Sequence, residues 1–146
     1  MSAENKDDEA GIRKLIENKL AAVRAKDVDG AMSNYAPDVL SFDVINPLRY
    51  LGADAIRKRL EEWFSSFQGS IGLEIRDLNI SVGDAVAFSH CLSHVSATTA
   101  AGEKLDMWWR ETACYRKLEG KWLITHQHSS VPFDVESGKA SLDLNP

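Results

Sequence analysis

The sequence is poor in cysteine: it has two in 146 residues, Cys91 and Cys114. Both stand in strand-like segments, without a CxxC pair or a framework of loops around them. A chain of this length can bury roughly two thirds of its unfolded surface, so its core needs no disulfide or metal. We therefore expect two buried free thiols, with a disulfide or a reactive thiol as the alternative.

Long basic clusters are missing too, and the net charge is −5. The short basic run at 57–59 is followed at once by Glu61 and Glu62, which argues against a nucleic-acid partner. No apolar run approaches the ~18 residues of a membrane-spanning helix, and the acidic first residues have no apolar core. We expect a cytoplasmic protein with no membrane partner.

Several catalytic motifs are also absent. Without a GxGxxG or P-loop pattern, the sequence gives no reason to expect a nucleotide, and we predict no cofactor. A GxSxG elbow is lacking, and neither cysteine stands at a helix start that would activate its thiol. Chemistry that depends on a covalent nucleophile is therefore not expected.

The first half of the chain has helical periodicity. Apolar residues recur at spacings of three and four, and an acidic leader at 1–10, expected to be mobile, precedes them. Asp27 fits the cap of a short second helix, and Pro37 is expected to end it. The pattern predicts helices over 12–26, 27–35 and 53–67.

The second half alternates with a period of two residues, which indicates strands. Gly83-Asp84 and Glu119-Gly120 mark tight hairpin turns. The expected strands cover 39–45, 71–82, 84–98, 104–117 and 121–131, and a mobile tail is expected at 135–146. Helices followed by a meander predict one α+β domain over 11–134, in which helices cover the apolar face of the sheet.

Several short motifs, in this order, resemble the nuclear transport factor 2-like superfamily. They are DVDG (27–30), YAPD (35–38), SFD (41–43), GADAI (52–56), GKW (120–122) and HQHS (126–129). The nearest branches are the ketosteroid isomerases and the SnoaL-like polyketide cyclases. The closing segment also resembles the association domain of calcium/calmodulin-dependent kinase II.

This resemblance implies a cone-shaped, curved antiparallel sheet wrapped around the N-terminal helices, the cystatin-like or ketosteroid isomerase-like fold. It further implies an apolar pocket at one end of the cone and a homodimer formed through the outer face of the sheet. Because the fold hosts isomerases, cyclases, dehydratases, ligand binders and association modules, it does not choose among these functions.

Asp43 is the first catalytic candidate. It matches the place of the general base in ketosteroid isomerases, and desolvation in an apolar pocket would make a carboxylate a stronger base. The alternative is a loop residue that binds the amides around Asn46 and Pro47.

The oxyanion hole of the isomerases departs from its usual residues in this sequence. The position of its helix tyrosine falls on Lys19, and that of its aspartate near Glu111 or Thr112. Lys19 could direct its ammonium at an oxyanion, or extend to solvent from the edge of the helix stripe. Glu111 is the second carboxylate if the strand face that it shares with Trp109 looks inward.

The remaining candidates are the expected ligand-binding residues, Trp63, Trp109, His126 and His128. Trp63 belongs to the aromatic helix stripe and is either core or part of the pocket. Strand alternation would place His126 and His128 on one face, with Trp122 and Ile124, in packing, in a dimer interface or in ligand contact. A metal site is not expected, because the other histidine pair lies on a strand separated from theirs by 104–117.

The sequence thus predicts a pocket for a small apolar or carbonyl-bearing molecule. Its chemistry would be cofactor-independent proton transfer next to a carbonyl, as in an isomerase, cyclase or lyase, with Asp43 as base and Glu111 or Lys19 stabilising the enolate. The alternative is a ligand-binding or association module without turnover.

Overall fold

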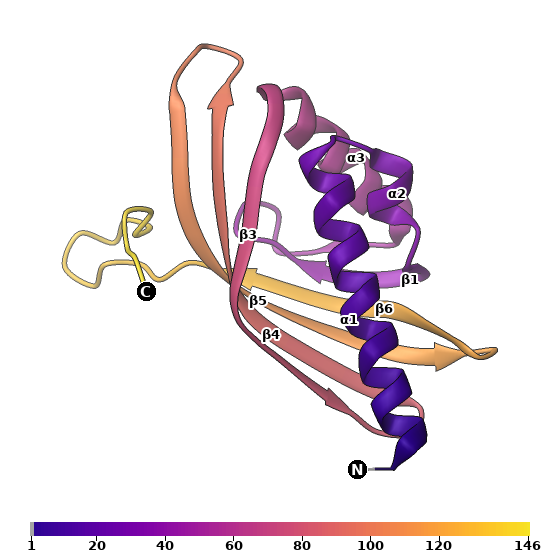
Figure 1. The fold of residues 1–146 in the computed structure, drawn as a ribbon. Coiled ribbons are helices and arrows are strands. Elements are labelled where there is room, and N and C mark those ends of the chain that lie inside the picture. The colour runs from indigo at the N-terminus through magenta and orange to yellow at the C-terminus, as the bar shows by residue number, and fades with distance from the viewer. Residues whose placement is uncertain (1) are drawn as a thin grey trace.

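A computed structural model describes residues 2–146 of the chain. Its helices are α1 (Ala3–Arg24), α2 (Val28–Met32) and α3 (Ala53–Ser65). Its strands are β1 (Tyr35–Phe42), β2 (Tyr50–Leu51), β3 (Phe67–Val82), β4 (Val86–Thr99), β5 (Lys104–Leu118) and β6 (Lys121–Ser130). The helices lie on one side of a sheet whose long strands change direction along their length (Figure 1). The predicted α+β cone is confirmed.

The sheet has the order β2-β1-β6-β5-β4-β3. Successive hairpins join β3 to β6, as the meander predicts, but β1 pairs with β6 in parallel. The sheet is therefore mixed rather than wholly antiparallel. A parallel neighbour distant in sequence needs a long connection, and the segment from β2 through β5 supplies it.

Helix α1 begins at Ala3, well before the expected start at residue 12. The Ser2 hydroxyl oxygen accepts a hydrogen bond from the Asn5 backbone N–H at 3.1 Å, which satisfies one of the free amides of the first turn. Residues 3–10, expected as a mobile leader, therefore form the first turns of the helix.

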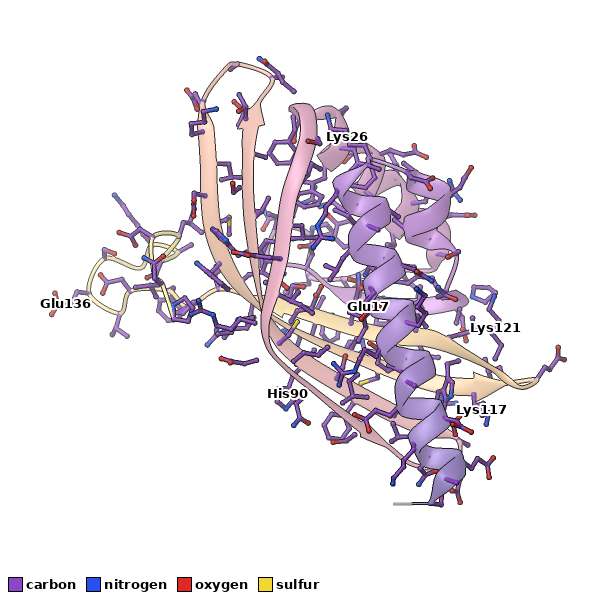
Figure 2. The ribbon with its side chains drawn as sticks, in the orientation of Figure 1. Glu17, Lys26, His90, Lys117, Lys121 and Glu136 are labelled. Carbon is purple, nitrogen blue, oxygen red and sulfur yellow. The ribbon has the colours of Figure 1, made fainter. Side chains whose placement is uncertain are left out.

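A partly buried polar contact attaches these first turns to the sheet. Asp8 accepts hydrogen bonds from the Trp122 indole N–H at 3.0 Å and from the Lys117 ammonium at 3.1 Å. Figure 2 shows Lys117 beside the N-terminal half of α1. The Trp122 hydrogen bond and the nearby Lys117 charge lower the pKa of Asp8 below its ordinary value, despite partial desolvation.

We predict that Asp8→Asn destabilises the fold at neutral pH and that the difference from wild type shrinks in acid. A carboxylate with a lowered folded pKa stabilises the fold above its unfolded pKa, and this contribution is lost as the pH falls through the folded value. Urea unfolding from pH 7 to pH 3 measures the effect, with the exposed Asp7→Asn as control. Equal urea midpoints for Asp8→Asn and Asp7→Asn at neutral pH would contradict the prediction.

The short helix and the first strand differ from expectation at one point. Asp27 caps α2 as predicted, accepting from the Gly30 N–H at 3.0 Å, but the helix ends at Met32. Pro37 does not end it and instead lies within β1, where the pairing with β6 shifts register between Tyr35 and Leu40. Such an irregularity tolerates a residue that has no N–H to donate.

The long strands have three further register shifts, and two of these are bulges of a single residue. In β3 an extra residue lies between Arg76 and Asn79, and Asp77 there has a left-handed φ of 58°. In β6 Thr125 is the extra residue, since Ile124 pairs with Tyr115 and His126 with Cys114. A bulge increases bending and reverses which residues face inward beyond it. These bulges shape the cavity described next.

Candidate functional site

The inner face of the sheet, together with α1 and α3, encloses a cavity of about 210 Å³. Its walls are mainly apolar, with Leu20 and Val23 from α1 and Leu73, Leu105 and Met107 from the sheet. Trp63 of α3 and Trp109 of β5 also line it, and their rings meet edge to face with centroids 6.4 Å apart. This part of the cavity suits a flat or branched apolar group.

A belt of polar side chains crosses the inner face of the sheet within this cavity. Ser41 pairs with Gln127 across β1 and β6. Two residues further along β6, Ser129 pairs with Glu111, and Glu111 pairs with Cys91. All five residues line the cavity, and we call them the polar belt. A ligand with one polar end could place that end on the polar belt and its apolar part against the two tryptophans.

Lys19 of α1 reaches this belt. Its ammonium donates to the Tyr35 hydroxyl oxygen and lies 3.4 Å from Gln127 Oε1, which also accepts from the Tyr35 hydroxyl at 2.7 Å. The Gln127 amide NH₂ donates in turn to Ser41 Oγ at 3.1 Å. The side chain of Lys19 therefore points into the cavity rather than extending to solvent.

Lys19 is held as an ammonium. Burial acts to lower the pKa of Lys19, but the Tyr35 oxygen and the Glu111 carboxylate favour the charged form and outweigh burial, so that the pKa is raised. A lysine with a raised pKa is a poor amine nucleophile and a strong electrostatic partner for a negative oxygen.

Glu111 is the carboxylate of the polar belt. Among residues 2–146 its Oε2 accepts one hydrogen bond, from Ser93 Oγ at 3.3 Å, which leaves acceptor positions of the carboxylate for a ligand. The face of β5 that carries Trp109 and Glu111 is the inward one. The adjacent Cys91 thiol lies 3.7 Å from Ser93 Oγ, and burial, with a smaller contribution from Glu111, raises the pKa of Cys91 to about 11.

We predict that Cys91 is unreactive in the folded protein at pH 8, because the thiolate is the reactive form and a pKa of about 11 leaves little of it. The test is iodoacetamide labelling of Cys114→Ser, which retains a single thiol, followed by mass spectrometry with and without urea. Labelling should be much slower in the folded than in the unfolded protein. Equal rates would contradict the prediction.

Asp43 also lines the cavity, at the end of β1. Its Oδ1 accepts from the Val44 backbone N–H at 2.6 Å, and its Oδ2 accepts from Arg59 Nε at 3.2 Å. Arg59 belongs to α3 and lines the cavity as well. Both oxygens of Asp43 are therefore engaged, one by a loop amide and one by a cation.

His126 and His128 are placed differently from expectation. Because Thr125 is the extra residue of the β6 bulge, Trp122 and Ile124 face inward before it and Gln127 and Ser129 after it. The expectation that both histidines share a face with Trp122 and Ile124 is wrong. Neither histidine lines the cavity. The His126 Nδ1–H donates a hydrogen bond to the Leu40 carbonyl oxygen at 2.8 Å, and the rings of both histidines pack edge-on against Phe42.

The other two histidines lie on β4, and β5 separates that strand from β6 as expected. His94 is held between Glu74 and Asp106, at 2.8 and 2.7 Å, and stacks on Trp108. Within residues 2–146, the His, Cys, Asp and Glu side chains form no group of three or more that could hold a metal ion.

Sequence reasoning missed the residues that join Lys19 to the sheet, Tyr35, Gln127 and Ser41. Tyr35 was part of a turn motif, and Gln127 stood between two conspicuous histidines. A polar residue at an inward position of a strand is the signal that could have found Gln127, but the bulge at Thr125 hides that position.

None of the helices in residues 2–146 is long and apolar enough to cross a membrane.

Comparison with known proteins identifies the fold. A nuclear transport factor 2-like protein from Pseudomonas putida KT2440 is 33% identical, with a TM-score of 0.88 over 97% of this chain and 98% of that one. No curated protein matches this chain.

More distant structures share the fold alone. A ketosteroid isomerase-like protein from Erwinia carotovora is 19% identical, with a TM-score of 0.73 over 89% of this chain and 97% of that one. A protein described as a calcium/calmodulin-dependent protein kinase II association domain, from Xanthomonas campestris, is 23% identical, with a TM-score of 0.73 over 85% of this chain and 87% of that one.

Residues 12–134 match the SnoaL-like domain family. The chain therefore belongs to the SnoaL-like branch of the nuclear transport factor 2-like superfamily.

Proposed function

We propose that the protein binds a small, mainly apolar carbonyl compound in its cavity and catalyses cofactor-independent proton transfer at the carbon next to the carbonyl. The observation that carries this proposal is that the ammonium of Lys19 and the carboxylate of Glu111 line one mainly apolar cavity. The likeness in fold to a ketosteroid isomerase-like protein supports the same class of chemistry.

In the proposed step the Cα–H bond of the ligand breaks and the proton passes to the Glu111 carboxylate. The electron pair forms a carbon–carbon double bond, and the carbonyl oxygen becomes an enolate oxygen that Lys19 stabilises. Before the step the negative charge is on Glu111, and after it the charge is on the ligand. The total charge of the cavity does not change, so no charge has to enter from water. Return of a proton to the same or another carbon completes exchange or isomerisation.

The alternative base is Asp43, the residue that the resemblance indicated. Its carboxylate already accepts from Val44 and Arg59, whereas among residues 2–146 Glu111 accepts a hydrogen bond from Ser93 alone. Glu111 therefore has more free acceptor positions for a substrate proton. For Asp43 we propose a role at the cavity wall, where it orients Arg59.

The test is proton exchange in heavy water. A panel of small enones, ketones and β-keto acids is incubated with the protein, and loss of the α-proton signal is followed by NMR. Exchange above the buffer rate for at least one member of the panel is expected. Thermal stabilisation by a ligand without exchange would favour a binding module without turnover. The absence of both exchange and thermal stabilisation across the panel would contradict the proposal.

We propose in addition that a second copy of the chain covers the outer face of the sheet. Apolar side chains are exposed there: Val86, Phe88 and Leu118 are 59%, 46% and 44% exposed. They border a groove that His126 also lines. Clustered apolar surface of this kind is typical of interaction sites, and the likeness to an association domain supports the proposal.

We predict that Phe88→Lys shifts the protein from dimer to monomer, since it would place a charge in an apolar contact that closes on itself by twofold symmetry. Light scattering coupled to size exclusion measures the mass. Lys121→Glu, an exposed change in the β5–β6 hairpin, serves as the charge-change control. A monomeric wild type, or a dimer unaffected by Phe88→Lys, would contradict this assignment.

A further inference from the structure

We infer that Glu111 makes the cavity selective for neutral ligands by balancing the charge of Lys19, and that its removal converts the cavity into a site for organic anions. This inference deepens the proposed function and rests on its claim that the cavity binds small molecules. It concerns ligand charge in binding and does not depend on turnover.

The first argument is a count of charges. Four charged side chains line the cavity, Lys19 and Arg59 with positive charge and Asp43 and Glu111 with negative charge. Arg59 and Asp43 neutralise each other through their contact at 3.2 Å, with side chains only 20% and 23% exposed. Lys19 and Glu111 are the remaining two, so the cavity has no net charge to offer a ligand.

The second argument is the position of Lys19 and Glu111 within the cavity. The ammonium is anchored by Tyr35 and Gln127, and Glu111 is a diagonal neighbour of Gln127, because Gln127 pairs with Ala113 two residues along β5. Within residues 2–146 the two charges make no direct ion pair, yet the Glu111 carboxylate is one of the groups that favour the ammonium. Glu111 thus acts as the counter-ion of Lys19.

This arrangement fixes the ligand charge that the cavity tolerates. A neutral ketone leaves the pair balanced and can accept a hydrogen bond from Lys19. A carboxylate ligand would add a second negative charge beside Glu111 in apolar surroundings, where an uncompensated charge is costly. With glutamine at 111, the ammonium would have no counter-ion and a carboxylate ligand would supply one.

The test uses two ligands of similar size, the neutral ketone 2-acetylnaphthalene and the anion 2-naphthoate, in isothermal titration calorimetry. Wild type should bind the ketone more tightly than the anion. Glu111→Gln should tighten naphthoate binding by about tenfold or more, as expected for loss of one nearby charge in a medium of low dielectric constant. The exposed Glu119→Gln, which removes the same charge from the β5–β6 turn, should leave both affinities unchanged.

A reciprocal variant makes the test independent of whether Glu111→Gln folds. Lys19→Met leaves Glu111 uncompensated, so it should favour the cation 2-naphthylmethylammonium over 2-naphthoate. The double variant Lys19→Met/Glu111→Gln should again prefer the neutral ketone, which gives a double-mutant cycle for the pair.

Different outcomes separate this inference from the proposed function. If wild type binds ketone and anion equally, or if neither single variant changes the charge preference, the charge inference is wrong while the binding function stands. If wild type binds neither the ketone nor the anion, both proposals are overturned.

Discussion

Replacing Glu111 by glutamine is expected to slow α-proton exchange by about 10²–10⁴-fold, the usual contribution of a positioned general base. The carboxylate lines the same cavity as the Lys19 ammonium that would stabilise the enolate, and among residues 2–146 it accepts one hydrogen bond, from Ser93. Glutamine has nearly the same shape and no basic oxygen. The loss should therefore appear in the exchange rate while the fold persists.

The matched comparison is Asp43→Asn, measured on the same ketone by NMR in heavy water. Because Asp43 is already engaged by Val44 and Arg59, its replacement is expected to slow exchange by less than about tenfold. Glu119→Gln controls for the loss of one negative charge. The reverse order, a large loss in Asp43→Asn and a small one in Glu111→Gln, would assign the base to Asp43 as the resemblance first indicated.

The second large effect is expected for Lys19→Met, which should lower the exchange rate by about 10²–10³-fold, as the removal of one oxyanion donor typically does. Methionine fills much of the same volume without the charge. The hydrogen bonds from the Tyr35 hydroxyl to Gln127 and from Gln127 to Ser41 do not involve Lys19. Tyr35, Gln127 and Ser41 should therefore keep their positions in Lys19→Met.

Circular dichroism checks the fold of Lys19→Met, and single-turnover exchange measures the chemical step. Lys14→Met, a change at an exposed position of the same helix, serves as the control and should exchange at the wild-type rate. An unchanged rate in a folded Lys19→Met protein would remove Lys19 from the proposed step.

Much of the fold could be predicted because local signals are strong. The helix stripe from Ile12 to Val23 and the hairpin at Glu119-Gly120 follow directly from spacing and turn chemistry, and both turn residues have positive φ values, 52° and 78°. The start of α1 was missed because its first residues are mainly polar and therefore show no helical repeat of apolar residues. These turns are attached to the sheet through Asp8, whose partners on β5 and β6 lie far away in sequence.

The parallel pairing of β1 with β6 also gave no local signal, since no turn joins the two strands. Bulges were the second source of error. Beyond Thr125, each residue of β6 faces the side opposite to the one that simple alternation predicts, which turns His126 and His128 outward and Gln127 inward. In β3 the comparable shift at Asp77 could have been read from the sequence, because the apolar positions change from Leu73 and Ile75 to Leu78 and Ile80.

Three of the four charged residues of the candidate site could be predicted, whereas the residues that they contact could not. Lys19, Asp43 and Glu111 were named from the sequence, and all three line the cavity. Their partners come from separate elements, Tyr35 from β1, Gln127 from β6 and Arg59 from α3. Contacts between distant elements depend on the curvature of the sheet, which residue alternation does not specify.

The most direct test of the central claim, that the cavity binds a neutral carbonyl compound, is methyl NMR of protein labelled with ¹³C at the methionine methyl groups. Met107 lines the cavity, whereas Met32 is buried in the core and does not line it. Titration with 2-acetylnaphthalene should shift the Met107 signal, because the aromatic ring would lie against it, and leave the Met32 signal in place. A Met107 signal that does not move at saturating ketone would contradict the account.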